Sequence, residues 1–239
     1  MASPIVFVHG GGEGGPAAWP LQAAHDFGRA TRFIYRPGFA PGESPRATDF
    51  GDDARAVLAA CGDGAHVVAH SYGGLAALQA AELDGSRVLS LILLEPVAFG
   101  LVRGDDAVEG YISALSVMER ASSISASDYF VALMTAMGVP EIPTPTTEAE
   151  LLEAERWRLL APPWDAPVSA EVVAAVPTLL VSGGWNPAQD VLDELLSAKG
   201  AERVTVPGAG HMVQYAEGIN EVISRFLEKV ESDLPTAGA

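Results

Sequence analysis

Short apolar runs, separated by breaks rich in glycine and proline, recur along the chain. Four of them are dominated by valine, isoleucine, leucine and alanine: residues 4–8, 65–69, 88–94 and 177–182. Uninterrupted apolar runs of this length are typical of parallel strands that are buried on both faces. Two further runs, residues 31–35 and 201–206, contain more polar residues and are also predicted to be strands.

Segments with helical character alternate with these runs. The predicted helices are residues 16–29, 48–61, 73–83 and 212 to about 229. A helix between successive strands is typical of a parallel sheet with helices on its faces. The pattern therefore predicts an α/β fold with a mostly parallel sheet.

One stretch, residues 97–175, is too long for a connection between two strands. It carries helical patterns of its own at residues 105–121, 127–137 and 148–160, and a proline-broken linker at residues 139–146. The pairs Ser127-Asp128 and Thr147-Glu148 are typical of helix starts. We therefore expect a core made of residues 1–96 and 176–239, with residues 97–175 inserted between its two parts.

Composition narrows the class of protein. A chain of 239 residues, 49% of them apolar, can bury one substantial core. The formal charge of −17 argues against nucleic acid or an anionic membrane surface as a partner. The single cysteine, Cys61, excludes an internal disulfide and a multi-thiolate metal site. With no apolar signal segment and no apolar run near the roughly 18 residues of a spanning helix, a cytoplasmic location is expected.

The strongest candidate for chemistry is Ser71. It lies between an apolar strand and an alanine-rich helix, with small residues, Ala69 and Gly73, two positions before and two after it. A sharp strand–turn–helix forces the central residue into unfavourable backbone angles and tolerates only small neighbours at those positions. The turn also holds the hydroxyl near a helix N-terminus, where negative charge is stabilised. Ser71 is therefore a candidate nucleophile.

A glycine cluster, His9-Gly10-Gly11-Gly12, directly follows the first predicted strand. It lacks the lysine of a phosphate-binding loop and the spacing of a dinucleotide fingerprint. Acyl transfer requires N–H donors at the carbonyl oxygen that becomes negative, and a glycine turn beside the nucleophile can supply one of them. We assign these donors to the backbone of Gly11 and Tyr72, and expect His9 to fix the loop.

His211 is the best candidate for the base. The preceding Pro207-Gly208-Ala209-Gly210 places it on a loop after the last strand, from which a side chain can reach within about 3 Å of a nucleophile on a neighbouring strand. His25 and His66 are less well placed, and His70 is expected to point away from the reaction if Ser71 points toward it.

Taken together, these motifs resemble the α/β-hydrolase family. They are the His9 glycine turn, Trp19, the loop Arg36-Pro37-Gly38-Phe39, the turn around Ser71, and Gly208-Ala209-Gly210-His211. The resemblance implies six of the family's usual eight strands and a helical cap, formed by residues 97–175 after the fourth strand, that covers the active site. It also implies that no cofactor and no metal is needed.

The family's usual acid is missing. Where members of the family commonly have Gly-x-x-Asp after the strand at residues 177–182, this chain has Asn186. Glu95 follows the strand at residues 88–94, a position from which certain lipases and dehalogenases of the family supply the acid. A carboxylate at the end of an apolar strand must be paired or functional. We therefore favour Glu95 as the third member of the triad, with Asn186 and Asp190 as alternatives.

The resemblance and the residues together predict a serine hydrolase. Ser71, His211 and Glu95 would cleave an ester or related carbonyl bond of a small to medium apolar or polyketide-like substrate through an acyl-enzyme. A small molecule is the expected partner, and the protein is expected to be a monomer or homodimer. The alternatives are hydrolysis of a carbon–carbon bond in dienoic diketo acids, a lyase or cyclase that uses the triad as acid and base, and a non-catalytic binding protein.

Specificity is expected to lie in the insertion. Apolar candidates for its pocket wall are Phe99, Tyr111, Met118, Phe130, Met134, Met137 and Trp157. Arg156 or Arg158 is a candidate for binding a substrate carboxylate, against the simpler interpretation of a solvated helix face.

Overall fold

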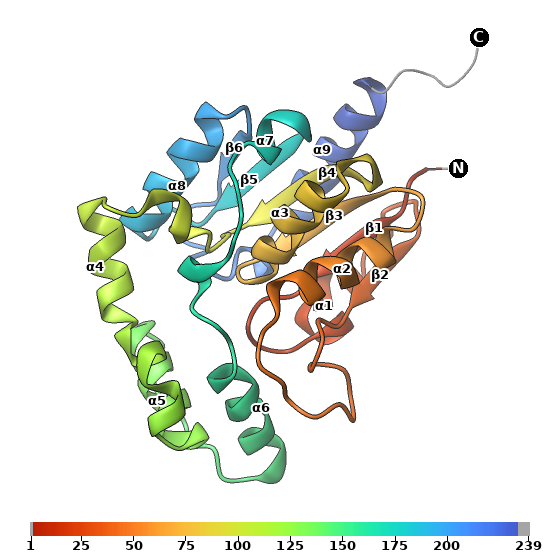
Figure 1. Ribbon diagram of the computed structural model, residues 1–239. Coiled ribbons are helices and arrows are strands. Elements are labelled where there is room, and N and C mark those ends of the chain that lie inside the picture. The colour runs from red at the N-terminus through yellow and green to blue at the C-terminus, as the bar shows by residue number, and fades with distance from the viewer. Residues whose placement is uncertain (1, 234–239) are drawn as a thin grey trace.

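The fold is organised around one parallel β-sheet. The computed structural model describes residues 2–233, and within them six strands pair in the order β2-β1-β3-β4-β5-β6 (Figure 1). The strands are β1 (Ile5–Val8), β2 (Thr31–Ile34), β3 (Ala65–His70), β4 (Val88–Leu94), β5 (Thr178–Ser182) and β6 (Glu202–Thr205). All five pairings are parallel. The predicted α/β class and all six predicted strands are confirmed.

Burial explains why the strands differ in composition. Every residue of β1, β3 and β5 is buried, whereas β2 and β6 form the two edges of the sheet and stay partly exposed. Edge strands have a neighbour on one side only, so polar residues are tolerated there. The four apolar runs of the sequence are therefore the central strands.

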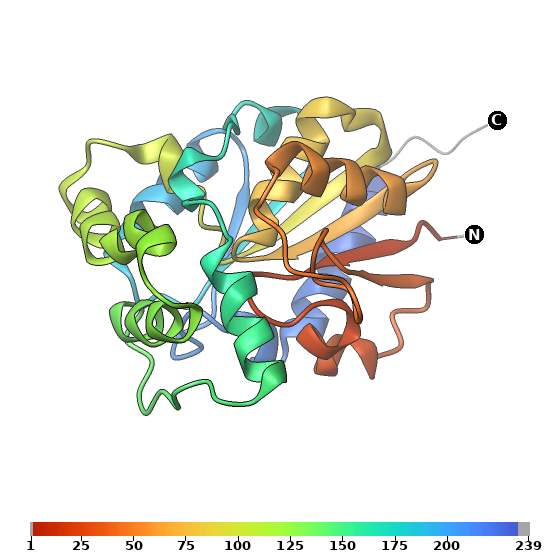
Figure 2. The ribbon, with the colours of Figure 1, turned by 60° about the horizontal axis from the view of Figure 1, so that its bottom comes forward.

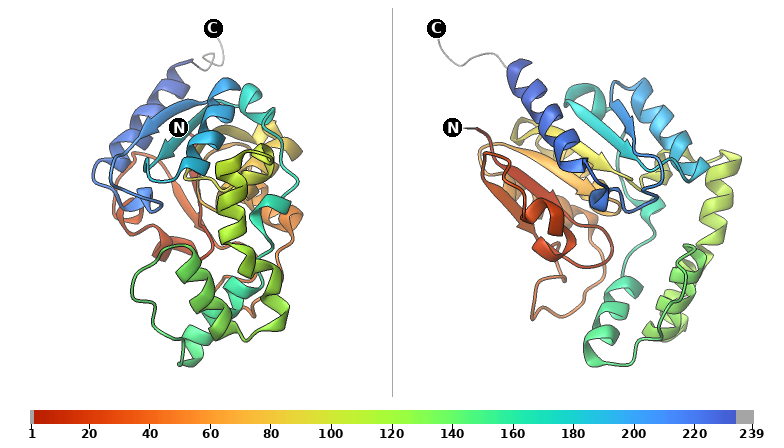
Figure 3. Two further views of the ribbon diagram at one scale, coloured as in Figure 1. Left: turned by 90° about the vertical axis from the view of Figure 1, so that its left-hand side faces the viewer. Right: turned by 180° about the vertical axis from the view of Figure 1, so that it is seen from behind.

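Helices cover both faces of the sheet. On one face α2 (Phe50–Cys61), α3 (Gly73–Leu83) and α8 (Pro187–Ala198) pack against alternate strand residues such as Val6 and Val8. On the other face α9 (Ile219–Asp233) and Trp19 pack against Ile5 and Phe7 (Figure 3). This alternation is the period of two expected of a strand buried on both sides.

The helix predicted over residues 16–29 is wrong for most of its length. The segment forms a turn of 3₁₀-helix at Gly15–Ala18 and the single-turn α1 (Pro20–Ala23), and continues irregularly to β2. Two prolines and Gly28, which has a φ of +66°, interrupt a longer helix. Trp19 is still a core residue, since it is buried against the ring of Phe7 at 5.2 Å.

The long connection between β4 and β5 is helical, as expected. It contains α4 (Asp106–Ala114), a 3₁₀ segment (Ser116–Ser123), α5 (Ala126–Ala136), α6 (Glu148–Arg158) and the short α7 (Val172–Ala175). The predicted helix at 105–121 is broken at Leu115, and Ser125, not Ser127, caps α5. Thr147 caps α6 as predicted, in a reciprocal arrangement with Glu150. Helices α4 to α6 lie beyond the carboxyl ends of the strands (Figure 2).

The helix predicted from residue 212 begins later. Residues Val213–Tyr215 form a 3₁₀ turn, and Gly218, with a φ of +79°, precedes the start of α9 at Ile219. Within the described residues, none of the helices has the length and apolar character that a membrane span requires.

We predict that Gly73→Ala destabilises the protein by about 3 kcal/mol, because an added methyl group must displace backbone. A Cβ on Gly73 would lie 2.5 Å from the carbonyl oxygen of His9 and 2.6 Å from that of Val8. Gly110→Ala in α4 is the matched control. Its Cβ would meet nothing within 4 Å, so this change is expected to stabilise by about 0.5–1 kcal/mol. Urea unfolding of both variants measures the difference, and similar free energies for the two would contradict the prediction.

Candidate active site

Ser71 occupies a strained turn between β3 and α3. Its φ is +53°, in the left-handed region that a non-glycine residue rarely adopts. Its N–H donates to the carbonyl oxygen of Leu94 on the neighbouring strand at 2.9 Å, and Gly74 N–H donates to its carbonyl at 2.9 Å. These two hydrogen bonds hold the turn so that the hydroxyl lies in a cavity at the carboxyl end of the sheet.

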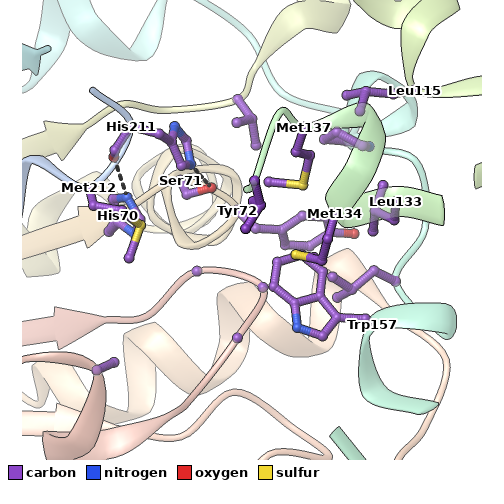
Figure 4. A pocket seen from close by; sticks show the side chains of 18 of the residues that line it. His70, Ser71, Tyr72, Leu115, Leu133, Met134, Met137, Trp157, His211 and Met212 are labelled. Carbon is purple, nitrogen blue, oxygen red and sulfur yellow. Dashed lines mark hydrogen bonds between the residues drawn. The ribbon is translucent and has the colours of Figure 1, made fainter. Parts of the chain in front are cut away.

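His211 reaches this hydroxyl from the loop after β6. The distance from its Nε2 to Ser71 Oγ is 2.8 Å, which is a hydrogen bond (Figure 4). The loop can approach closely because Gly183 and Gly210 meet where the segments after β5 and β6 cross. A side chain on Gly183 would collide with the backbone of Gly210. The structure therefore brings together two side chains that lie 140 residues apart in the sequence.

Glu95 lies behind His211. Its Oε2 is 3.4 Å from His211 Nδ1 and accepts a hydrogen bond from the indole Nε1 of Trp185 at 3.0 Å. Its Oε1 accepts from the backbone N–H of Gly183 at 2.5 Å. The carboxylate is fully buried, and its residue has a φ of +47°. Burial removes the hydrogen bonds that a carboxylate makes with water, and these protein donors replace them.

The other two candidates for the acid are engaged elsewhere. Asn186 Oδ1 accepts from the N–H of Ala188 at 3.0 Å and caps α8. Asp190 pairs with Arg203 at 2.6 Å. Of the three candidates, Glu95 is the one in contact with His211.

The glycine loop after β1 is held from beneath by a buried polar network. His9 Nε2 accepts from the N–H of Arg36 at 2.9 Å, and its Nδ1 donates to the carbonyl of Gly10 at 2.9 Å. The Arg36 guanidinium donates to the same carbonyl at 2.8 Å and to Asp53 at 2.7 Å. Burial, and next the charge of Arg36, lower the pKa of His9 well below its usual value. His9 is thus a neutral residue that fixes the loop, as expected.

The two predicted N–H donors lie beside Ser71. Gly10 to Gly12 and Tyr72 line the cavity, and a Cβ on Gly10 would lie 3.2 Å from the Cβ of Ser71. Among residues 2–233, neither the N–H of Gly11 nor that of Tyr72 donates to another protein group. Both are therefore available to an oxygen atom bound at Ser71.

The expectation that His70 points away from the site is wrong. Its side chain lines the same cavity, and its Nε2 donates to the backbone carbonyl of His211 at 2.9 Å (Figure 4). The left-handed turn at Ser71 ends the strand alternation on which the expectation rested. Burial, and then the neighbouring His211, lower the pKa of His70 to about 3. A neutral His70 therefore holds the loop that carries His211.

Sequence reasoning also missed Trp185. It stands in the segment Gly183-Gly184-Trp185-Asn186-Pro187, where attention went to Asn186 as the substitute for the usual aspartate. Its ring is edge-on to His211, with centroids 6.0 Å apart, while its N–H is bound to Glu95. No pattern in the sequence signals this contact, because it depends on where Glu95 lies.

The cavity above Ser71 has a volume of about 360 Å³ and mostly apolar walls. Six of the seven predicted pocket residues line it: Phe99, Tyr111, Met118, Met134, Met137 and Trp157. The seventh, Phe130, packs against the core outside the cavity. Neither candidate arginine lines it, since Arg156 donates to the carbonyl of Gly38 and Arg158 pairs with Glu155.

Comparison with known proteins identifies the family of this chain. The model of the alpha/beta hydrolase family matches residues 5–224. The chain belongs to the alpha/beta hydrolase family. A search of curated proteins found no match.

Solved structures of similar fold come from several bacteria. NosK from Streptomyces actuosus is 22% identical, with 97% of this chain and 100% of that chain covered and a TM-score of 0.65. A thermophilic esterase from Thermogutta terrifontis is 20% identical, with 96% and 91% covered and a TM-score of 0.71. MenH from S. aureus is 13% identical, with 96% and 94% covered and a TM-score of 0.70. At these identities the likeness shows the fold.

We predict that Glu95→Gln lowers kcat by about four orders of magnitude, the effect of neutralising the acid behind a catalytic histidine. Asn186→Ala is expected to leave kcat within a few-fold and to cost about 1 kcal/mol of stability through loss of the α8 cap. Steady-state kinetics with an activated ester, with thermal melts of both variants, make the comparison. A large loss of kcat in Asn186→Ala with none in Glu95→Gln would show that Glu95 is only structural.

We predict that the free energy of unfolding falls as the pH drops below about 6.5, where an unfolded histidine takes up a proton. Folded His70 does not take one up until the pH approaches about 3. The contribution of His70 to the free energy of unfolding is therefore complete above pH 6.5. Below that pH it falls by about 1.4 kcal/mol per pH unit. Urea unfolding between pH 7 and pH 5 should show a shallower pH slope in His70→Gln than in wild type; equal slopes would contradict this.

Proposed function

We propose that this protein is a cofactor-independent serine hydrolase that cleaves an ester or related carbonyl bond through an acyl-enzyme on Ser71. The observation that carries the proposal is the 2.8 Å hydrogen bond between Ser71 Oγ and His211 Nε2 at the base of an apolar cavity. A serine aligned with a base, which is itself backed by a buried carboxylate, is the arrangement of a nucleophile activated for acyl transfer.

In the proposed mechanism, His211 takes the Ser71 proton as the hydroxyl attacks the substrate carbonyl. The imidazolium that forms is stabilised by the charge of Glu95, whose two N–H partners hold it in place. The carbonyl oxygen, now negative, accepts hydrogen bonds from the N–H groups of Gly11 and Tyr72. His211 then protonates the leaving alcohol, and water, activated by the same base, releases the acyl group.

We propose that residues 97–175 form a cap over the cavity that contains Ser71. Met118, Met134 and Trp157 come from this segment and form walls of the cavity that contains Ser71. Such a cover excludes bulk water from the reacting carbonyl and strengthens the electrostatic interactions around it.

Two of the alternatives fit this site less well. A dienoic diketo acid carries a carboxylate, whereas neither lysine nor arginine occurs among the residues that line the cavity. A binding protein has no chemical need for the aligned Ser71 and His211 pair.

The esterase from Thermogutta terrifontis among the similar structures agrees with ester hydrolysis.

We predict a burst of nitrophenolate, close to one equivalent per active site, when the protein is mixed with para-nitrophenyl butanoate in a stopped-flow instrument. The burst arises because acylation releases the nitrophenolate before water cleaves the acyl-enzyme. Ser71→Ala should abolish it, and mass spectrometry of quenched wild type should show the acyl group on Ser71. Turnover that persists in Ser71→Ala, with no acylated protein, would contradict the covalent mechanism.

A further inference from the structure

The wall of the cavity is unusually rich in methionine. The described residues contain four methionines, and all four line the cavity: Met118, Met134, Met137 and Met212. The first three come from the segment between β4 and β5, and Met212 directly follows His211. Met134 and Met137 lie across the cavity from His211 in Figure 4. No methionine of the described residues is used in the core away from this cavity.

Methionine has an unbranched and flexible side chain. Because it has three rotatable bonds and a polarizable sulfur, it adapts its shape to different apolar partners, and it is common on surfaces that bind several ligands. The four methionines therefore let this wall adapt to apolar chains of different lengths more readily than branched side chains alone would.

The charges of the lining residues disfavour ligands that carry a carboxylate. Glu13 is the one acidic residue that lines the cavity among the described residues, and no lysine or arginine lines it. The two arginines that flank Trp157 in sequence are bound outside the cavity, to Gly38 and Glu155. A carboxylate carried into this space would lose its water and gain no cationic partner, which is strongly unfavourable.

Trp157 closes the cavity beside the glycine loop. A Cβ on Gly11 would lie 2.5 Å from a carbon of the Trp157 ring, so the ring lies directly on this glycine. The acyl group next to the Gly11 N–H is therefore enclosed by apolar surface. The cavity volume of about 360 Å³ lies in the range of small-molecule binding sites.

We infer that the substrates are neutral esters whose flexible, unbranched acyl chain binds in the cavity beside its four methionines, and that acyl chains ending in a carboxylate are rejected. This inference rests on the proposed function for its catalytic readout. The recognition itself depends on the cavity and not on the chemistry at Ser71.

The first test compares para-nitrophenyl octanoate with the mono-para-nitrophenyl ester of octanedioic acid, which has the same chain length and a terminal carboxylate. Wild type should prefer the neutral ester in kcat/KM by at least about 100-fold, because the carboxylate is buried without a partner. Neutral esters from butanoate to octanoate should differ by less than about tenfold, because the wall adapts. Equal or better turnover of the charged ester would overturn the inference.

Matched lysine variants separate the cavity from long-range charge effects. Met137→Lys places a cation at the cavity wall and should lower the preference for the neutral ester by about tenfold or more. Thr135→Lys adds the same charge to an exposed position of α5 that does not line the cavity, and should leave the preference within about twofold. Equal shifts in both variants would overturn the inference.

A triple variant, Met118→Leu, Met134→Leu and Met137→Leu, tests the role of flexibility. Leucine conserves volume and apolar character but is branched and stiffer. The range of accepted chain lengths should narrow, with one length retained and the others reduced more than tenfold. A uniform decrease across all lengths would show that the methionines do not set the tolerance.

Binding experiments keep the test independent of hydrolysis. If no ester shows Ser71-dependent turnover, the proposed function fails, but the inference is still decided by calorimetry on Ser71→Ala. Methyl hexyl ketone should bind at least about tenfold more tightly than its analogue that ends in a carboxylate. Comparable affinities of the two would overturn the inference even if ester hydrolysis were established.

Discussion

The parallel pairing of β3 with β4 is the constraint on which the site depends. It places Leu94 opposite His70, so that Ser71 and Glu95 leave the sheet side by side at its carboxyl edge. Both residues then adopt positive φ values, +53° and +47°, as the chain turns sharply away from the strands. Such strain persists only where the surrounding structure holds it, and here the hydrogen bond from Ser71 N–H to Leu94 ties one turn to the end of the next strand.

The position of Glu95 follows from its place at the carboxyl end of β4. Glu95 follows the strand next to the one that precedes Ser71, and the loop after β5 supplies its hydrogen-bond donors, Gly183 N–H and the Trp185 indole. A buried carboxylate without such donors would be driven toward its neutral form. In the same loop, Trp185 contacts both Glu95 and the ring of His211.

Two sets of buried hydrogen bonds fix the loops on either side of Ser71. His9, Arg36 and Asp53 fix the glycine loop on one side of Ser71. On the other side, His70 holds the backbone of His211. Their buried imidazoles have lowered pKa values, so both histidines act as neutral hydrogen-bonding groups at physiological pH. The cavity beside these loops is lined in part by four flexible methionines.

Local pattern alone determined the strands, the turn at Ser71 and the glycine loop, because each depends on residues close together in sequence. The apolar runs had to be buried, and the turn at Ser71 has no room for a side chain at Gly73. By contrast, the tertiary structure decided which of Glu95, Asn186 and Asp190 meets His211, and it revealed His70 and Trp185 at the site. The helix expected at residues 16–29 failed for a local reason, because two prolines and Gly28 interrupt it. Contacts between residues about 90 to 140 positions apart depend on how strands and loops cross at the sheet edge, and no local periodicity encodes that crossing.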